Sequence, residues 1–174
     1  PVEKIREADA YTIAHEPVSS TALMERAAAA CFRWIVKKVT DTKRVRVGCG
    51  MGNNGGAGLV IARLLHNAGY STDVFMVRHA GEPTADFALN FNLLADLPGL
   101  VITDVFEADP LIEIDEEDVV IDAILGSGLT RPVTGWMADV IDQINHSGAM
   151  VISIDIPSGL FADKAVNLKH PKIV

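Results

Sequence analysis

Apolar residues recur along the chain with two different spacings, and each spacing indicates a different kind of element. In the first forty residues the apolar positions return every three or four residues, as on one face of an α-helix. We predict one helix at residues 3–15, ended by Pro17, because proline disfavours a helical conformation in the residue before it. A longer second helix is predicted to run to about Lys38, and its candidate N-caps are Ser19, Ser20 and Thr21.

Beyond residue 43, short apolar runs alternate with longer apolar segments that end at glycine or proline. The short runs predict strands at residues 44–49, 71–77, 100–103, 119–125 and 149–154, the last two buried. The longer segments predict helices at residues 57–68, 84–97 and 134–146. Such alternation is typical of a parallel sheet with helices on both faces. The predicted fold class is therefore α/β: one Rossmann-like three-layer α/β/α domain over residues 1–174, with a mostly parallel sheet and two N-terminal helices.

Composition narrows the classes of partner. With 49% hydrophobic and 22% charged residues, the chain has the composition of a globular domain. The formal net charge is −8 and no dense basic run occurs, so we expect no nucleic-acid partner. No apolar run approaches the roughly 20 residues that span a bilayer, and no signal-peptide pattern opens the chain, so we expect no membrane partner and a cytoplasmic protein.

The densest charge is acidic and lies between Asp104 and Asp118. This stretch contains eight carboxylates and no basic residue. We interpret it as a solvated loop, with a metal or protein contact as the alternative.

Three of the predicted strands end in polar, glycine-rich turns. These turns are Gly50–Gly58, Asp122–Gly128 and Asp155–Gly159. Parallel strands bring such turns to one edge of the sheet, and doubly wound sheets bind ligands outside the carboxyl ends of their strands. The candidate site is therefore this edge.

The first turn has the residues of a phosphate-binding loop. Gly50, Gly52 and Gly55 satisfy G-x-G-x-x-G between a predicted strand and a predicted helix. If the helix begins near Ala57, its free N–H groups and its dipole face whatever the loop holds and favour a phosphate. A tight turn alone also explains the glycines, although it does not require the amides of Asn53 and Asn54.

Two aspartates mark the other turns. Asp122 interrupts an apolar strand, and a buried carboxylate is costly unless it is paired, hydrogen-bonded or bound to a cation. It either caps backbone N–H groups of a neighbouring loop or serves a ligand as an acid or base. Asp155 ends a strand and precedes Pro157, Ser158 and Gly159, where Ser158 offers an oxygen; turn chemistry alone is the alternative.

An NADP-dependent oxidoreductase is a further alternative. Such enzymes hold the ribose near the end of the second strand, where Arg78 and His79 would suit a 2′-phosphate only loosely. No Tyr-x-x-x-Lys pair and no other apparatus for hydride transfer is visible.

The segments Gly50–Gly58, Asp122–Gly128 and Ser153–Gly159, in this order and spacing, resemble the NAD(P)HX epimerase family. That family comprises the YjeF N-terminal domain and relatives of apolipoprotein A-I-binding protein. Residues 8–13 and 23–28 also resemble the family's N-terminal helices, so the resemblance covers nearly the whole chain.

The resemblance implies an isomerase that interconverts the R and S forms of hydrated NADH and NADPH, so that a stereospecific dehydratase repairs both. It also implies a homodimer and a potassium ion, which the matching residues Asn54, Asp122 and Ser158 would hold. As a hypothesis, Asp122 or Asp155 assists loss and return of the C6 hydroxyl. The positions that match substrate contacts are Asn53, Asn54, Gly55, Gly56, Ala57, Gly126, Ser127, Gly128, Leu129, Thr130, Arg131, Pro132 and Asp155.

Two departures from the family pattern bear on function. The family's loop reads N-N-G-G-D-G, whereas Ala57 stands where the aspartate is expected. A non-catalytic relative that binds the nucleotide or a protein through the same fold is therefore the main alternative to an enzyme. The family's domain also usually continues past the Asp-Ile-Pro-Ser-Gly turn by further strands, so we expect the front part of a longer or bifunctional protein, with the dehydratase attached or separate.

Overall fold

The computed structural model describes residues 1–79, 81–109, 112–164 and 170–174. The elements in chain order are α1 (Val2–His15), α2 (Ser20–Ile35), β1 (Val45–Cys49), α3 (Asn53–Asn67), β2 (Thr72–Val77), α4 (Ala85–Ala95), β3 (Val101–Val105), β4 (Val119–Ala123), α5 (Trp136–His146) and β5 (Met150–Ser153). Each predicted helix and strand is thus found within a few residues of its expected position.

The five strands form one sheet in the order β3-β2-β1-β4-β5, and every neighbouring pair is parallel. The chain builds the sheet outward from β1 to β3 and then crosses to β4 on the other side of β1. The strand order therefore reverses between β1 and β4, which is where ligands bind in sheets of this type.

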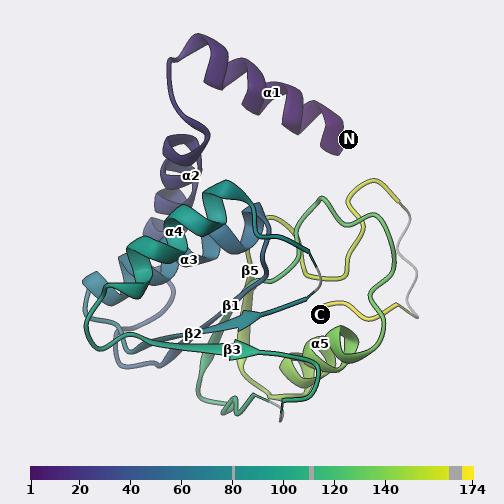
Figure 1. The fold of residues 1–174 in the computed structure, drawn as a ribbon. Helices are drawn as coiled ribbons and strands as arrows, with labels where there is room; N and C mark the ends of the chain where they lie inside the picture. The colour runs from purple at the N-terminus through teal and green to yellow at the C-terminus, as the bar shows by residue number, and fades with distance from the viewer. Residues whose placement is uncertain (80, 110–111, 165–169) are drawn as a thin grey trace.

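Side chains that alternate along each strand form two cores, one on each face of the sheet. In β2, Val74 and Met76 pack in the core under α2, α3 and α4, whereas Phe75 and Val77 pack with Val140 of α5 on the other face. This alternation of successive side chains explains why apolar runs, rather than amphipathic ones, form the central strands. Figure 1 shows the resulting three layers, so the predicted α/β/α fold is confirmed.

Two predicted helix ends and the predicted burial of one strand were wrong. Helix α3 begins at Asn53 rather than near residue 57, and α2 ends at Ile35 rather than near Lys38. Strand β5 is only half-buried, with 48% of Met150 exposed, because it lies at the edge of the sheet.

The acidic stretch is not simply a solvated loop. Asp104 belongs to β3 and pairs with Arg78, and Asp118 is buried beside Arg46. The stretch itself contains no basic residue, and its two partners come from elsewhere: Arg46 from β1 and Arg78 from the position directly after β2.

Helix α1 stands apart from these layers. None of its residues is buried, and Figure 1 shows it beyond the layer of α2 and α4. No helix in the described part of the chain is both long and apolar enough to cross a membrane.

Candidate functional site

Glycines at the carboxyl end of β1 let α3 lie directly against the sheet. A Cβ atom on Gly50 would lie 1.9 Å from the carbonyl oxygen of Ile124, and one on Gly55 would lie 1.8 Å from that of Gly50. Neither distance is tolerable, and both obstacles are backbone atoms. Close approach therefore requires glycine at both positions and brings the start of α3 beside the ends of β1 and β4.

The start of α3 presents unpaired backbone N–H groups. Gly52 is its N-cap and offers no side chain, and the first helical hydrogen bond runs from Gly56 N–H to the Gly52 carbonyl, at 2.9 Å. The N–H groups of Asn53, Asn54 and Gly55 precede that bond and lack partners within the helix. The positive end of the helix dipole thus lies within the glycine turn, four residues earlier than predicted, and suits a phosphate.

Asp122 of β4 is completely buried on the α5 side of the sheet. Its carboxylate accepts hydrogen bonds from the Ser158 hydroxyl (2.5 Å), the Ser158 N–H (2.8 Å), the Ser153 hydroxyl (2.9 Å) and the Ile124 N–H (3.3 Å). Burial raises the pKa of Asp122, and these hydrogen bonds oppose the rise without cancelling it. The carboxylate therefore carries a charge that only neutral donors stabilise.

Asn54 and Ser158 meet at one carbonyl oxygen, and Ser158 connects Asp122 to it. The Leu125 carbonyl accepts from Asn54 Nδ2 at 3.0 Å and from the Ser158 hydroxyl at 3.2 Å, and that hydroxyl also bonds Asp122. The structure thus brings together the three residues predicted to hold potassium. Among the described residues, no group of three or more His, Cys, Asp or Glu side chains is placed to hold a metal.

Asp155 differs from Asp122 in both exposure and backbone. Its side chain is exposed, and its φ of +66° makes it the only left-handed residue other than glycine in the described chain. Such a backbone costs roughly 1–2 kcal/mol in a residue with a Cβ and is found where function requires a particular direction. Asp155 Oδ2 accepts the N–H of Ser127 at 2.6 Å and lies 2.7 Å from where a Cβ on Gly126 would stand.

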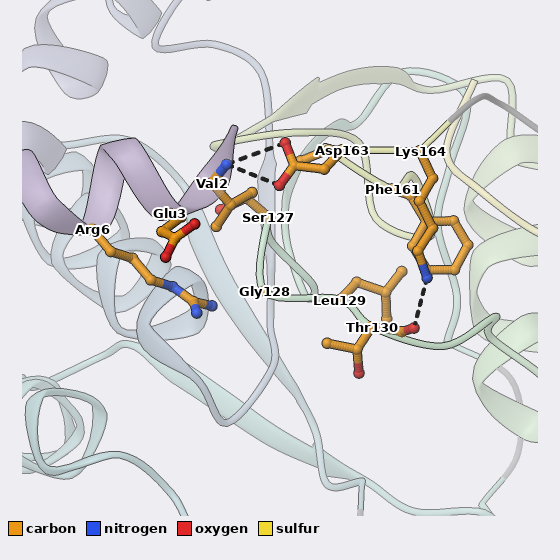
Figure 2. A pocket seen from close by; sticks show the side chains of 11 residues that line it. Val2, Glu3, Arg6, Ser127, Gly128, Leu129, Thr130, Phe161, Asp163 and Lys164 are labelled. Atoms are coloured by element: carbon orange, nitrogen blue, oxygen red, sulfur yellow. Dashed lines mark hydrogen bonds between the residues drawn. The ribbon is translucent and has the colours of Figure 1, made fainter.

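A cavity of about 270 Å³ opens beside Ser127 (Figure 2). It is lined by the turn after β4, by the start of α1 and by a segment near the C-terminus. The lining residues are Val2, Glu3, Arg6, Ser127, Gly128, Leu129, Thr130, Phe161, Ala162, Asp163 and Lys164.

Some of the residues predicted to contact the substrate do not line this cavity. Gly55 and Gly56 are buried, and a Cβ on Gly56 would meet Met24 Sδ at 3.0 Å, so Gly56 serves packing, whereas Gly55 keeps its N–H at the start of α3. Ala57 is half-buried against the core beneath α2–α4, and Arg131 and Pro132 are exposed; none of the three lines the cavity. Conversely, sequence reasoning missed the contributions of α1 and of Phe161–Lys164, which no local motif announces.

The end of β2 does not favour an oxidoreductase. Arg78, the residue considered for a 2′-phosphate, pairs with Asp104 at 2.6 Å and lies over the ring of Phe91. Its guanidinium is therefore already engaged within the protein.

Comparison with known proteins identifies relatives along most of the chain. The family described as "YjeF-related protein N-terminus" matches residues 20–172. An NAD(P)H-hydrate epimerase from Limosilactobacillus fermentum is 34% identical over 92% of this chain and 74% of its own length. A bifunctional NAD(P)H-hydrate repair enzyme Nnr from Thermofilum pendens is 37% identical over 84% of this chain, which corresponds to 28% of that protein.

A solved structure supports the fold. The crystal structure of yeast ynu0 superposes with a TM-score of 0.82 at 24% identity, over 98% of this chain and 74% of the yeast chain. The likeness extends beyond residues 20–172 and so includes the start of the chain.

Proposed function

The chain belongs to the family of YjeF-related protein N-termini, and from this premise we propose that it is an NAD(P)H-hydrate epimerase. Such an enzyme is an isomerase that interconverts the R and S forms of hydrated NADH and NADPH. The observation that carries the proposal is Asp155: an exposed carboxylate on a left-handed backbone, at the carboxyl edge and beside the cavity.

The dinucleotide spans the turns that meet at this edge. The N–H groups of Asn53, Asn54 and Gly55 provide an anion site for its diphosphate. The turn from Gly126 to Thr130 then carries the nicotinamide end toward Asp155, since Ser127 is bonded to that carboxylate and also lines the cavity.

Asp155 acts as the acid and base. In the hydrated ring, C6 carries both a hydroxyl group and the ring nitrogen. Protonation by Asp155 lets the hydroxyl leave as water while the nitrogen lone pair forms a C=N bond, which makes C6 planar. Water then adds to the opposite face and returns its proton to Asp155, so atoms and charge balance and only the configuration changes.

Asp122 holds the site together rather than touching the ring. All four of its hydrogen bonds lead to residues 124, 153 and 158, which fix the turn that carries Asp155. Asn54, Asp122 and Ser158 fit a potassium ion, because the Asp122 carboxylate, the Ser158 hydroxyl and the Leu125 carbonyl are in hydrogen-bond contact. A turn of the Asn54 amide, whose nitrogen faces that carbonyl, would add its oxygen to the set. When bound, the ion would supply the positive charge that offsets this carboxylate.

An epimerisation assay tests the proposal. Purified chain is mixed with chirally enriched hydrated NADH, with potassium present or replaced by a large organic cation. Equilibration far above the spontaneous rate is expected, faster with potassium, and the thermal midpoint is expected to rise with potassium concentration. Equilibration at the spontaneous rate in both buffers would refute the epimerase.

Ala57 favours one alternative, a relative that binds the nucleotide without turning it over. The variant Ala57→Asp separates the readings. An active wild type excludes the alternative, whereas an inactive wild type that gains activity on Ala57→Asp is a disabled epimerase. Binding without epimerisation in both proteins supports the non-catalytic relative.

The proposal includes two partners. A dehydratase, attached or separate, would consume the epimerised product, as the bifunctional relatives suggest. A second copy of the chain would cover apolar side chains that α1 and α2 leave exposed, namely Ile5 (56%), Tyr11 (65%) and Trp34 (51%). Sedimentation of the wild type against Trp34→Glu tests the homodimer.

A further inference from the structure

The cavity beside Ser127 draws much of its lining from outside the motifs of the proposed site. Arg6 comes from α1, which precedes the matched residues 20–172, and Lys164 comes from the segment after the Asp-Ile-Pro-Ser-Gly turn. Ser127 joins the cavity to the catalytic edge, because its N–H binds Asp155. A group held in the cavity therefore borders the turn that carries the proposed acid, although Asp155 itself does not line the cavity.

Two cations approach the same turn from opposite sides. Figure 2 shows Arg6 reaching from α1 toward Gly128, and Lys164 reaching toward Thr130 from the other side. Lys164 Nζ donates to the neutral Thr130 carbonyl at 3.3 Å and lies over the ring of Phe161. Arg6 has no hydrogen bond or ion pair within the described residues. Both side chains therefore keep donors for a ligand.

Two carboxylates line the cavity as well, but they belong to the start of α1. Both oxygens of Asp163 accept the N–H of Val2, at 2.9 and 3.1 Å. Glu3 lies in the first turn of the helix, where the dipole stabilises a negative charge. The end of the cavity near Gly128 and Thr130 is thus bounded by cations that these carboxylates do not pair with.

We propose that Arg6 and Lys164 form a phosphate-binding subsite for the dinucleotide, which makes α1 part of the substrate site. This inference rests on the proposed function, which supplies a substrate with phosphate groups. A guanidinium binds phosphate through two parallel hydrogen bonds. The Arg6 guanidinium lies close to this turn, since a Cβ on Gly128 would stand in van der Waals contact with Arg6 Nη2, at 3.6 Å. The phosphate is either the second phosphate of the diphosphate, whose first lies at the start of α3, or the 2′-phosphate of hydrated NADPH.

Epimerisation kinetics of Arg6→Gln test the subsite. KM is expected to rise at least tenfold, with kcat within about twofold of wild type, because Arg6 binds a phosphate group and makes no contact with the reacting atom C6. An equal rise for hydrated NADH and NADPH assigns the diphosphate, and a rise confined to hydrated NADPH assigns the 2′-phosphate. Unchanged KM values for both substrates would overturn the subsite.

Two further variants separate binding from folding. Lys4→Gln removes the same charge from the same helix, but Lys4 pairs with Glu7 and does not line the cavity, so its KM should equal that of wild type. Asp163→Asn loosens the tie between α1 and the loop and should raise KM in the same direction as Arg6→Gln. Equal KM increases in Lys4→Gln and Arg6→Gln would show a general charge effect and contradict the subsite.

Binding of NAD⁺ and NADP⁺ by calorimetry keeps this test independent of catalysis. If the wild type is not an epimerase but binds either nucleotide at least tenfold more tightly than Arg6→Gln does, the proposed reaction fails and the phosphate subsite stands. Equal affinities of the two proteins would overturn the subsite, whatever the activity.

Discussion

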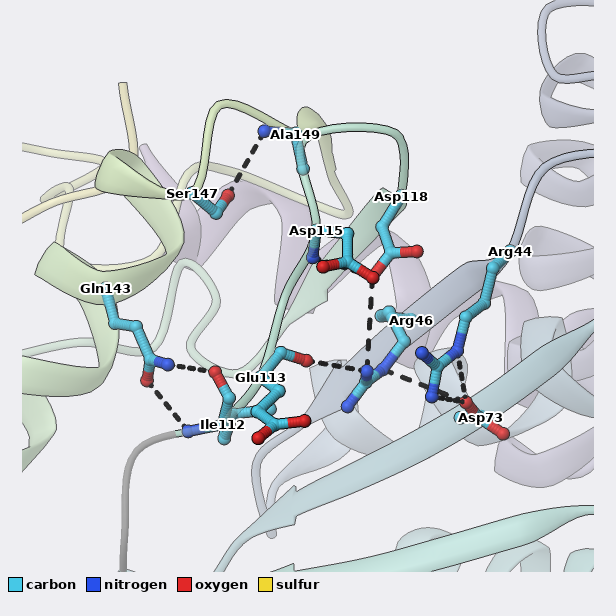
Figure 3. A network of polar contacts seen from close by, with 10 residues as sticks. All are labelled: Arg44, Arg46, Asp73, Ile112, Glu113, Asp115, Asp118, Gln143, Ser147 and Ala149. Atoms are coloured by element: carbon cyan, nitrogen blue, oxygen red, sulfur yellow. Dashed lines mark hydrogen bonds and ion pairs between the residues drawn. The ribbon is translucent and has the colours of Figure 1, made fainter.

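The amino and carboxyl edges of the sheet stabilise buried and half-buried aspartates by different means. At the amino edge, Asp118 and Asp73 lie against Arg46, and Arg44 binds Asp73 as well (Figure 3). At the carboxyl edge, Asp122 is even more deeply buried, yet its four partners are hydroxyl and N–H groups. Arginine side chains therefore neutralise the carboxylates at the amino edge, whereas no cationic side chain neutralises the Asp122 carboxylate.

This difference indicates that the amino edge contributes to stability and that the carboxyl edge serves the proposed function. An arginine that also bonds the Glu113 carbonyl, as Arg46 does at 2.7 Å, holds a loop on the sheet and leaves no charge for a ligand. Neutral donors hold a carboxylate in place but leave its charge to attract a cation. Substitutions at the amino edge should therefore change stability alone, and those at the carboxyl edge should change activity.

The largest effect is expected for Asp155→Asn. Asparagine tolerates the left-handed backbone and can still accept the Ser127 N–H, so the folded state is retained. It cannot carry a proton to and from C6, and kcat should fall by about 10²–10⁴. Stopped-flow epimerisation measures the loss, and Asp41→Asn, an exposed aspartate before β1, is the control. A kcat within threefold of wild type would remove Asp155 from the mechanism.

The sequence predicted that the polar turns meet at the carboxyl edge, because the direction of the strands alone decides where they lie. Apolar runs separated by helices require parallel strands, and parallel strands bring Asp122, Asp155 and the first glycine turn together. The start of α3 was misplaced because Gly55 and Gly56 are poor helix formers, costing about 1 kcal/mol each relative to alanine. Their helical conformation is fixed by contacts with Gly50 and Met24, which no local pattern encodes.

The cavity was unpredictable for a related reason. Val2 and Asp163 are hydrogen-bonded although 161 positions separate them. Nothing in either segment's spacing or composition marks the contact. Arg46 illustrates the same limit at the amino edge, since its acidic partners come from β2 and from the stretch before β4.

The next effect in size is expected for Arg46→Met. It leaves Asp118 buried without a cation and should lower the free energy of unfolding by roughly 3 kcal/mol, the low end for a broken buried pair because the charges are 4.0 Å apart. Urea unfolding measures it. The half-exposed Arg44 gives the control, and Arg44→Met should cost less than about 1 kcal/mol. Reduced kcat in correctly folded Arg46→Met would contradict the separation of the two edges.

A smaller and pH-dependent effect is expected for Asp122→Asn in potassium-free buffer. The asparagine amide would place an N–H group against the Ser153, Ser158 and Ile124 donors, which should lower the free energy of unfolding by about 1–3 kcal/mol. Because burial raises the pKa of Asp122, the wild type loses stability relative to the variant as the pH rises from the ordinary pKa of aspartate, about 4, through the raised pKa of the folded state. The deficit of the variant should therefore be largest near pH 4. A deficit that grows with pH would mean that this carboxylate is compensated after all.

The smallest effect is expected for Lys43→Ala, although Lys43 makes an ion pair with Glu117 at the amino edge. The hydrogen bond from Lys43 lowers the pKa of Glu117, so any contribution of the pair is present near neutral pH and is lost as the pH falls through that pKa. Glu117 is 80% exposed, however, and water screens its charge in both folded and unfolded chains. Thermal midpoints of wild type and variant should coincide in about 0.15 M salt. A clear fall in the thermal midpoint of the variant at pH 7 that disappears in high salt would show that charge pairing, and not burial, decides how much each acid contributes to stability. Coincident midpoints leave burial as the reason why substitutions at or beside Glu117, Asp118 and Asp122, within six residues, have such different effects.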